Sequence, residues 1–300
     1  MKTKPARHLL AIDTATAWQS VALLRDEQVL ALLEQDADGS HARSLMGAID
    51  RLLRGAGLSL KDLQGLAVSI GPGSFTGLRV GLATMLGFRA VLGTPIVTVP
   101  TLEAMAWNLR DVKGLLVPVL KSRHNEVYWA AYEWLPGTGL HTHIAEQVGP
   151  PASVARALQG VNAGTLFGDG WQAYEKGIRE AVEAVGGRVQ EVRPEQQRPS
   201  AVSVGLAGRQ CLEAGQVAGP ELVPRYVQRT EAEVKFDEQQ GVSALERRRQ
   251  RVAGKLAQGR RKRAQKTDRN RRRCGQHGGF ALAVVCLYLE SDSKRPQRAE

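Results

Sequence analysis

The chain has 300 residues, of which 43% are hydrophobic, so it is long enough for two domains and apolar enough for packed cores. This composition excludes a chain that is disordered along most of its length. The formal net charge of +11 is concentrated in residues 246–273, where fourteen Lys or Arg accompany only two acids, so the rest of the chain is nearly neutral.

The cysteines and the apolar runs indicate in which cellular compartment the protein is expected. Cys211, Cys274 and Cys286 are odd in number and lack CxxC spacing, which indicates neither a disulfide framework nor a cysteine zinc site. The N-terminal residues show no export signal. The longest apolar run, 280–289, has ten residues, whereas a membrane-spanning helix needs roughly 20. We therefore expect a cytoplasmic protein that does not cross a membrane.

The first third of the chain predicts three antiparallel strands followed by alternating helices and strands. Period-2 and period-3.6 apolar patterns, separated by polar turns and closed by helix-ending glycines, define this order. The expected elements are strands at 8–12, 20–24, 28–34, 66–70 and 95–99 and helices at 40–55, 78–92 and 101–109. Together they form a compact βββαβαβα unit.

The second half repeats this alternation more weakly, and the pattern fades after about residue 236. The tail is rich in Arg, Gln and Lys and has little apolar periodicity. We therefore divide the chain into domains at 1–110, 111–235 and 236–300. The expected elements of the middle domain are strands at 115–120, 127–133, 141–146 and 165–167 and helices at 152–158, 171–185 and 200–214.

A glycine-rich turn at 71–77 joins a predicted strand to a predicted helix. Glycines at such a place can leave backbone N–H groups free to bind an anion, which makes Gly71, Gly73, Ser74 and Thr76 candidates for a phosphate loop. The segment matches neither standard nucleotide fingerprint. The alternative is structural: Ser74 or Thr76 caps the helix while the glycines form the turn.

Two other strand ends carry carboxylates. Asp13 and Thr14 end the first strand, where a carboxylate and a hydroxyl can orient a magnesium-bound phosphate. Asp169 lies between glycines at the end of a later strand, a place that suits either a ligand contact or a turn. Asp and Thr also favour strand ends by bonding to their own backbone, so the structural interpretation stays open for all three.

Catalytic and metal-binding patterns are otherwise lacking in the sequence. A helical metal site built on His41 needs a ligand three or four residues on, and those positions hold Ser44 and Leu45. His141 and His143 have no third ligand nearby in the sequence. Neither a Ser/His/Asp set nor a carboxylate pair can be proposed from spacing. We therefore assign no catalytic residue, metal or cofactor.

Three segments together resemble the TsaB family. They are Leu9-Leu-Ala-Ile-Asp-Thr-Ala-Thr, Gly71-Pro-Gly-Ser-Phe-Thr-Gly-Leu-Arg-Val-Gly, and the strand at 95–101 with its following helix. The resemblance continues through His124-Asn-Glu-Val-Tyr-Trp-Ala and ends near Pro224-Arg-Tyr-Val-Gln-Arg-Thr-Glu-Ala-Glu, so it covers about residues 7–235. Lys121 and Ser122 depart from the family pattern, which puts a ligand role of that turn in doubt.

Membership of that family implies a fold, partners and a pathway. The fold is the α/β actin/hexokinase/Hsp70-like (ASKHA) fold of two similar subdomains. The implied role is non-catalytic: the chain binds a catalytic paralogue, TsaD, which transfers a threonylcarbamoyl group to N6 of adenosine 37 in tRNAs that read ANN codons. The ATPase TsaE docks on that pair, tRNA is contacted indirectly, and the isolated chain can form a homodimer.

The resemblance also implies a partner surface on the helices at 40–55 and 76–92. The paralogue carries a His-x-x-x-His metal pair on the first of these helices, whereas the corresponding positions here are His41 and Leu45, so the second ligand is missing. Small and apolar residues allow helix axes to approach closely. The candidate interface residues are Met46, Ile49, Leu53, Phe75, Arg79, Ala83, Met85 and Gly87.

Two other functions remain as alternatives. One is an enzyme, either a phosphotransferase that uses Asp13 and the glycine turn, or a metallopeptidase; nucleotide binding lost on Asp13→Ala, or bound metal, would distinguish them. The other is a tRNA-binding module that acts through the basic tail by counterion release. The tail at 236–300 is also consistent with a disordered extension that has no dedicated function.

Overall fold

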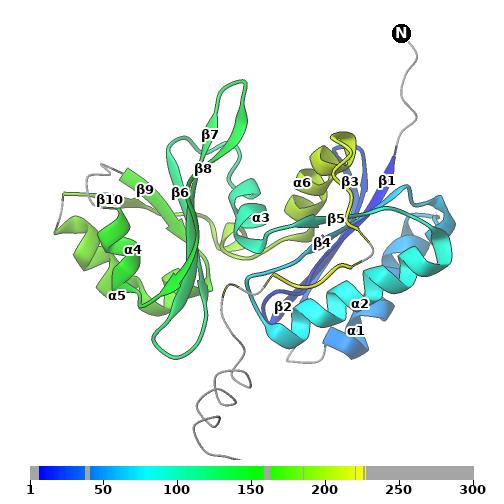
Figure 1. Ribbon diagram of the computed structural model, residues 1–300, viewed down its shortest axis with the longest axis horizontal. Helices are drawn as coiled ribbons and strands as arrows, with labels where there is room; N and C mark the ends of the chain where they lie inside the picture. The colour runs from blue at the N-terminus through cyan, green and yellow to red at the C-terminus, as the bar shows by residue number, and fades with distance from the viewer. Residues whose placement is uncertain are drawn as a thin grey trace, which may run out of the picture. The chain divides into compact units, whose positions relative to one another are not determined.

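The computed structural model describes residues 7–37, 41–158, 163–184, 186–219, 221–225 and 227. The predicted basic tail at 236–300 lies outside the described residues, as do Cys274 and Cys286. The described part forms two lobes, and each is built on one five-stranded mixed sheet (Figure 1).

The sheet of the first lobe has the strand order β3-β2-β1-β4-β5. Strand β1 is antiparallel to β2 and parallel to β4, and β4 is parallel to β5. The side chains of β1 and β4 are apolar along most of their length, as expected for strands that are covered on both faces. The strands are β1 (His8–Asp13), β2 (Trp18–Arg25), β3 (Gln28–Asp36), β4 (Gly65–Ser69) and β5 (Ile96–Val99).

Helices cover both faces of this sheet. Successive residues of a strand point to opposite faces, so Leu10 and Ile12 pack against α1 (His41–Gly55) and α2 (Phe75–Leu92), while Leu9 and Ala11 pack against α6 (Ala201–Glu213). Helix α3 (Thr101–Trp107) follows β5 and packs beside α6, and η1 (Leu60–Asp62) is a short 3₁₀ turn before β4.

The position of α6 corrects the predicted domain division. The sequence placed residues 200–214 in the second domain, but α6 packs on the sheet of the first lobe. Two glycines permit this contact, because a Cβ on Gly205 would come within 2.5 Å of the Leu24 side chain and one on Gly208 within 2.8 Å of the Ala67 side chain. Along the sequence, the residues of the second lobe therefore lie between two segments that belong to the first lobe.

The sheet of the second lobe repeats the topology of the first. Its order is β10-β9-β6-β7-β8, with β6 antiparallel to β7 and parallel to β9. Two five-stranded sheets with the same order confirm the predicted actin/hexokinase-like duplication. The strands are β6 (Leu115–Lys121), β7 (Val127–Leu135), β8 (Gly139–Gly149), β9 (Ala163–Phe167) and β10 (Arg188–Gln190), with helices α4 (Ala152–Ala157) and α5 (Asp169–Glu183) and the 3₁₀ turn η2 (Pro194–Gln197).

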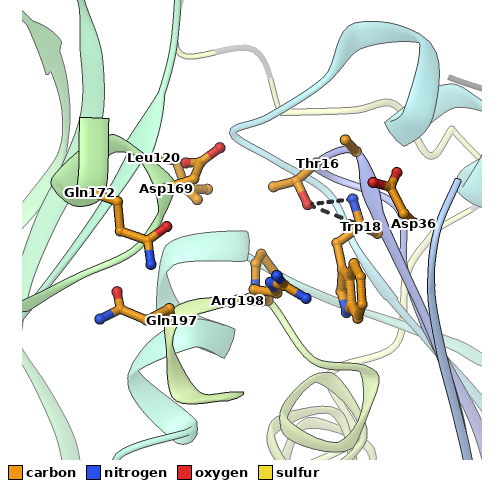
Figure 2. Close-up of a pocket in the computed structure, with 10 residues that line it drawn as sticks. Thr16, Trp18, Asp36, Leu120, Asp169, Gln172, Gln197 and Arg198 are labelled. Carbon is orange, nitrogen blue, oxygen red and sulfur yellow. Dashed lines mark hydrogen bonds between the residues drawn. The ribbon is translucent and has the colours of Figure 1, made fainter. Parts of the chain in front are cut away.

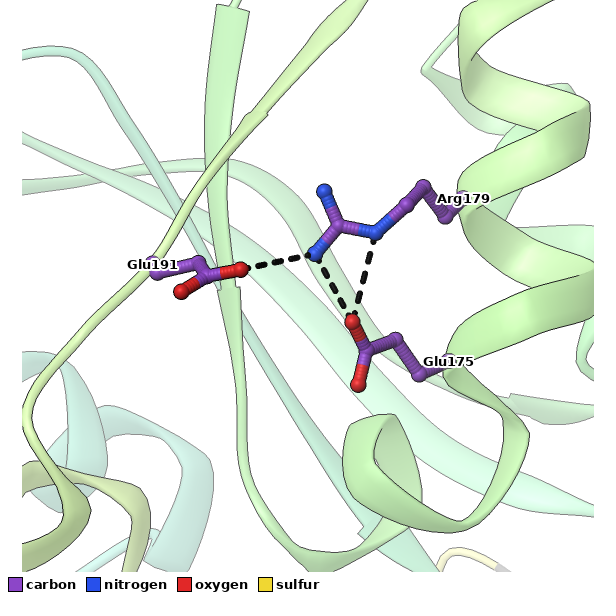
Figure 3. A network of polar contacts seen from close by, with 3 residues as sticks. All are labelled: Glu175, Arg179 and Glu191. Atoms are coloured by element: carbon purple, nitrogen blue, oxygen red, sulfur yellow. Dashed lines mark hydrogen bonds and ion pairs between the residues drawn. The ribbon is translucent and has the colours of Figure 1, made fainter.

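A polar network joins α5 to the chain that follows β10 (Figure 3). The Arg179 guanidinium donates to Glu175 one turn earlier, at 2.8 Å from Nη2 to Oε1, and reaches Glu191 at 3.4 Å. Glu191 is 82% exposed, so its contribution to stability is small. The network orients the side chain of Arg179 over the ring of Trp171, which is buried in the core of this lobe.

Helix α2 is long and apolar enough, by length and composition alone, to cross a membrane. In the fold it connects two strands of one sheet, and Leu78, Leu82, Met85 and Phe88 lie in the core. Its apolar composition arises because its outward face also carries small or apolar residues. The small and apolar residues on the outward face of α2 therefore account for its high hydropathy.

Candidate functional site

The glycine turn is filled by the protein's own backbone. Gly71 and Gly73 have φ values of +113° and +157°, which favour glycine. A Cβ at Gly73 would overlap the carbonyl oxygen of Ala15, and one at Gly77 would overlap that of Thr14. The N–H of Ser74 donates to the Ala15 carbonyl at 2.6 Å. The turn thus holds the loop between β1 and β2 where a phosphate cradle would need open space.

The hydroxyl of Ser74 caps α2, as the structural interpretation predicted. Ser74 Oγ accepts a hydrogen bond from the N–H of Gly77 at 3.2 Å. The hydroxyl of Thr14 donates to the carbonyl of Gly77 at 2.8 Å, and Thr14 is fully buried. Thr14 and Ser74 therefore bind within the protein and hold α2 against β1, whereas Thr76 is exposed in the first turn of α2, and its phosphate role stays a prediction.

Asp13 is a buried carboxylic acid that no ligand can reach in this structure. Its side chain is 0% exposed, and Oδ1 accepts a hydrogen bond from the N–H of Ala15 at 3.0 Å. Burial raises the pKa of Asp13 to about 6, although the Ser69 hydroxyl and the Ala15 amide act in the opposite direction. Oδ1 of Asp13 thus bonds to the loop that follows β1, whereas Oδ2 has no hydrogen-bond partner among the described residues, and a ligand role for Asp13 stays a prediction.

Asp169 lines a pocket of about 230 Å³, and neither Asp13 nor Thr14 is among the lining residues (Figure 2). Asp169 Oδ1 accepts a hydrogen bond from the N–H of Lys121 at 2.9 Å, and burial raises the pKa of this carboxyl. The opposite wall carries Thr16, Trp18 and Asp36. Of the predicted set of Asp13, Thr14 and Asp169, only Asp169 lines this pocket.

The charges of this pocket do not favour a phosphate. Two carboxylates, Asp36 and Asp169, line it, and like charges repel an anion. The Arg198 guanidinium, the one cation among the lining residues, lies 4.0 Å from the ring centroid of Trp18 and covers that ring. The aromatic face is thus already occupied by a side chain of the protein.

His41 is the remaining member of the two-histidine pattern. It begins α1 and is 5% exposed, and its Nε2 lies 2.8 Å from the carbonyl oxygen of Thr16. Leu45, one turn later, packs in the core at 1% exposure. Within the described residues, no group of three His, Cys, Asp or Glu side chains is placed to hold a metal ion.

The outward faces of α1 and α2 separate the predicted interface residues into two groups. Ile49, Leu53 and Met85 are buried in the core, so these three are corrected: a partner cannot contact them without unfolding the lobe. The helical period places them on the sheet side. The exposed members are Met46, Phe75, Arg79, Ala83 and Gly87.

Sequence reasoning missed two further residues of this surface. Val91 at the end of α2 is 85% exposed, and Gly47 of α1 lies beside Met46. A Cβ added at Gly47 or at Gly87 would meet no atom within 4 Å in the part of the chain that the structure describes, so neither glycine is required by the packing there. A glycine in a helix interior costs about 1 kcal/mol relative to alanine. We name this face, formed by Met46, Gly47, Phe75, Arg79, Ala83, Gly87 and Val91, the α1/α2 face.

Comparison with known proteins gives consistent matches. The family model described as TsaD, tRNA N6-adenosine threonylcarbamoyltransferase, matches residues 34–236. The tRNA threonylcarbamoyladenosine biosynthesis protein TsaB of Bacillus subtilis is 32% identical over 237 residues, which cover 77% of this chain and 99% of that protein. The protein of the same name from Escherichia coli is 35% identical over 55% of this chain and 73% of its own length.

A solved structure agrees with these sequence matches. YeaZ from Pseudomonas aeruginosa superposes with a TM-score of 0.61 at 26% identity, and the match covers 74% of this chain and 100% of that one. The similarity thus extends over the whole length of the relative and over about three quarters of this chain. The chain belongs to the TsaB family of tRNA threonylcarbamoyladenosine biosynthesis proteins.

Proposed function

We propose that this chain is a non-catalytic subunit in the formation of N6-threonylcarbamoyladenosine at position 37 of tRNA, and that it binds a TsaD-type transferase through the α1/α2 face. Such a role places it in the cytoplasm with its tRNA substrates, and TsaE is the further partner that would join the pair. Relatives that carry the name of this pathway at 32–35% identity support the role.

The observation that carries the partner surface is the pair of solvent-facing glycines. Gly47 and Gly87 lower the intrinsic stability of their helices, and no atom of the described residues lies within 4 Å of a Cβ built at either one. Glycine and alanine on the surface of a helix allow a second helix to approach closely, so that backbone contacts backbone. Exposed Met46 and Val91 add apolar area at the same face, where the Arg79 guanidinium lies 3.7 Å from the centroid of the Phe75 ring. A helical partner accounts for all of these features together.

The core positions support the absence of catalysis in this chain. Leu45 stands where a second histidine would be needed, and it is packed in the core beside Ile49. Asp13 is closed off from solvent, and the glycine turn is filled by Ala15. Neither a metal site nor a phosphate loop is thus available from these residues as they lie.

The test is co-purification with the same organism's TsaD-type protein. We expect wild type to form a stable heterodimer by size-exclusion chromatography with light scattering, and Gly87→Leu and Ala83→Arg to weaken it by tenfold or more, about 1.4 kcal/mol. Gly87→Ala separates binding from folding, because it should stabilise the isolated chain by about 0.5–1 kcal/mol while still weakening the complex.

The matched control is Ala173→Arg, which adds the same charge on the exposed side of α5 in the other lobe and should leave the heterodimer intact. The isolated chain is measured in parallel, because a homodimer that uses the α1/α2 face should be lost with the same variants. Failure of wild type to bind the TsaD-type protein, or equal loss with Ala173→Arg, would refute the proposal.

A second role concerns the basic tail, whose structure lies outside the described residues. Residues 246–273 carry a net charge of +12, which favours tRNA phosphates through counterion release and predicts strong salt dependence. We propose that the tail adds tRNA affinity to the chain. Removal of residues after Phe236 should reduce tRNA binding at low salt and leave thermal stability unchanged; equal binding by the truncated chain would overturn this role.

A further inference from the structure

Positive charge is concentrated on α1 and α2, which pack side by side on one face of the first sheet (Figure 1). With histidine taken as neutral, these two helices carry five arginines and one aspartate, a net charge of +4. The four other described α-helices carry four Lys or Arg and six acids, a net charge of −2. The arginines of α1 and α2 are Arg43, Arg51, Arg54, Arg79 and Arg89.

Arginines and small residues alternate along the outward side of both helices. Residues four apart lie on the same side of a helix, one turn from each other. One such row on α1 is formed by Arg43, Gly47, Arg51 and Gly55, and one on α2 by Phe75, Arg79, Ala83, Gly87 and Val91; all of them are exposed. A partner helix that packs on Gly47 therefore meets an arginine one turn away on either side.

The arginines on either side of Gly47 are not neutralised by the described part of the chain. Arg43 and Arg51 form neither a hydrogen bond nor an ion pair with any described residue. Asp50 is the only acid of the two helices, and its Oδ1 is 2.9 Å from Nε of Arg54. An arginine side chain stays charged at all relevant pH values. The row that carries Gly47 is thus cationic in the free protein.

These charges restrict what can cover the α1/α2 face. Removing a guanidinium from water is favourable only where the partner supplies carboxylates or other acceptors. A second copy of this chain, bound through the same face about a twofold axis, would bring the arginines of one copy close to those of the other. Nucleic-acid phosphates suit arginines, but such interfaces are more polar than a face that exposes Met46 and Val91. An acidic helical protein satisfies both the charge and the apolar area.

We infer that the α1/α2 face selects an acidic helical partner over a second copy of this chain, through Arg43 and Arg51. The inference rests on the proposed function, and it gives the chemistry that the TsaD-type protein must present: Asp or Glu side chains beside small or apolar residues of the helix that contacts Gly47. Arg43 and Arg51 are eight residues apart, about 12 Å along α1, so we expect the carboxylates on the partner to be about two turns apart.

The test is the double variant Arg43→Glu with Arg51→Glu in the full-length chain, which changes the net charge of α1 and α2 from +4 to zero. Binding to the TsaD-type protein is measured by titration at 0.1 M and 1 M NaCl, where the Debye length is about 10 Å and about 3 Å. At 0.1 M salt we expect binding about tenfold or more weaker than wild type, and at 1 M salt a difference of about threefold or less. The basic tail is the same in both proteins, so its contribution cancels in the comparison.

Self-association gives the opposite expectation and is measured by analytical ultracentrifugation of each chain alone. At 0.1 M NaCl the double variant should self-associate as strongly as wild type or more strongly, because repulsion between the two copies is removed. The neutral variant Arg43→Gln with Arg51→Gln should weaken the heterodimer by an intermediate factor. Thermal denaturation of each variant shows whether it is folded.

The matched control is Arg156→Glu with Lys176→Glu, which makes the same change in charge at exposed positions of α4 and α5 and should leave heterodimer affinity within about twofold of wild type. Equal affinity of wild type and the Arg43/Arg51 variants, or an equal loss in the control, would overturn the inference while the proposed function stands. Loss of tRNA binding with an unchanged heterodimer would assign the arginines to RNA and overturn it as well. A wild-type chain that forms no heterodimer would refute both.

Discussion

Replacing Asp13 by asparagine should remove a pH dependence that is built into the core of the first lobe. The carboxyl is fully buried at the end of β1, and burial raises its pKa to about 6, from 3.8 in the unfolded chain. Asparagine keeps the Oδ1 that accepts from Ala15 and carries no charge at any pH. The substitution therefore removes the ionisation and keeps the shape.

The magnitude follows from linkage. Because the folded-state pKa is raised, the folded protein binds this proton more tightly than the unfolded chain, so the stabilisation is complete below about pH 4 and is lost as the pH rises through 6. A difference of about 2 pKa units corresponds to roughly 3 kcal/mol over the whole range. About 1.4 kcal/mol of this should be lost by wild type between pH 5 and pH 8.

The assay is urea denaturation of wild type and Asp13→Asn at pH 5 and at pH 8, followed by tryptophan fluorescence. At each pH the free energy of unfolding of the variant is compared with that of wild type, and the quantity of interest is how much this difference changes between pH 5 and pH 8. The cost of replacing the carboxyl hydroxyl by an amide group is the same at both pH values and cancels in this change. Relative to wild type, the variant should gain about 1–1.5 kcal/mol at pH 8 compared with pH 5. Parallel pH profiles for the two proteins would show that Asp13 does not titrate in this range and would refute the reasoning.

Three further substitutions test the packing and the ion pairs. Met85→Ala should cost about 2–5 kcal/mol in urea denaturation, because Met85 is fully buried; a cost below 1 kcal/mol would contradict its place in the core. Arg225→Ala should cost about 1–3 kcal/mol at pH 7, because it removes the one counterion that the described residues provide for the buried Glu146 side chain, whose Oε2 lies 3.1 Å from Arg225 Nε. The cost should be smaller at acidic pH, where Glu146 is protonated; a cost that grows with acid would contradict this cause. Glu191→Gln should change stability by less than about 0.5 kcal/mol in thermal denaturation, and a larger effect would mean that its bond to Arg179 is stronger than its exposure allows.

Strands and helices were largely predictable because their apolar periods are regular. The helix expected at 40–55 is observed as His41–Gly55, and the strand expected at 115–120 as Leu115–Lys121. The short strand β10 was missed, since three residues are too few to show a period. The sequence also could not place α6, because its contact with the first sheet joins residues more than 100 positions apart.

The orientation of α2 explains the errors at the candidate site. This helix carries apolar or small residues on both faces, so its sequence does not distinguish the side that meets the sheet from the side that meets solvent. Met85 and Ala83 were therefore assigned to one surface, although they lie on opposite faces. The glycine turn was ambiguous for a similar reason: glycines allow close approach of a phosphate or of backbone, and only the fold reveals Ala15 as the occupant.

The placement of α6 has a consequence for synthesis on the ribosome. When residue 110 has been made, the first sheet has all five strands, but the face that α6 covers still exposes Leu9, Ala11 and Ala67. At about 5–20 residues per second, the chain needs roughly 5–20 s more to reach the end of α6. The second lobe is synthesised within that interval, so we expect it to fold first, while the N-terminal lobe waits with an open apolar face that a chaperone can bind.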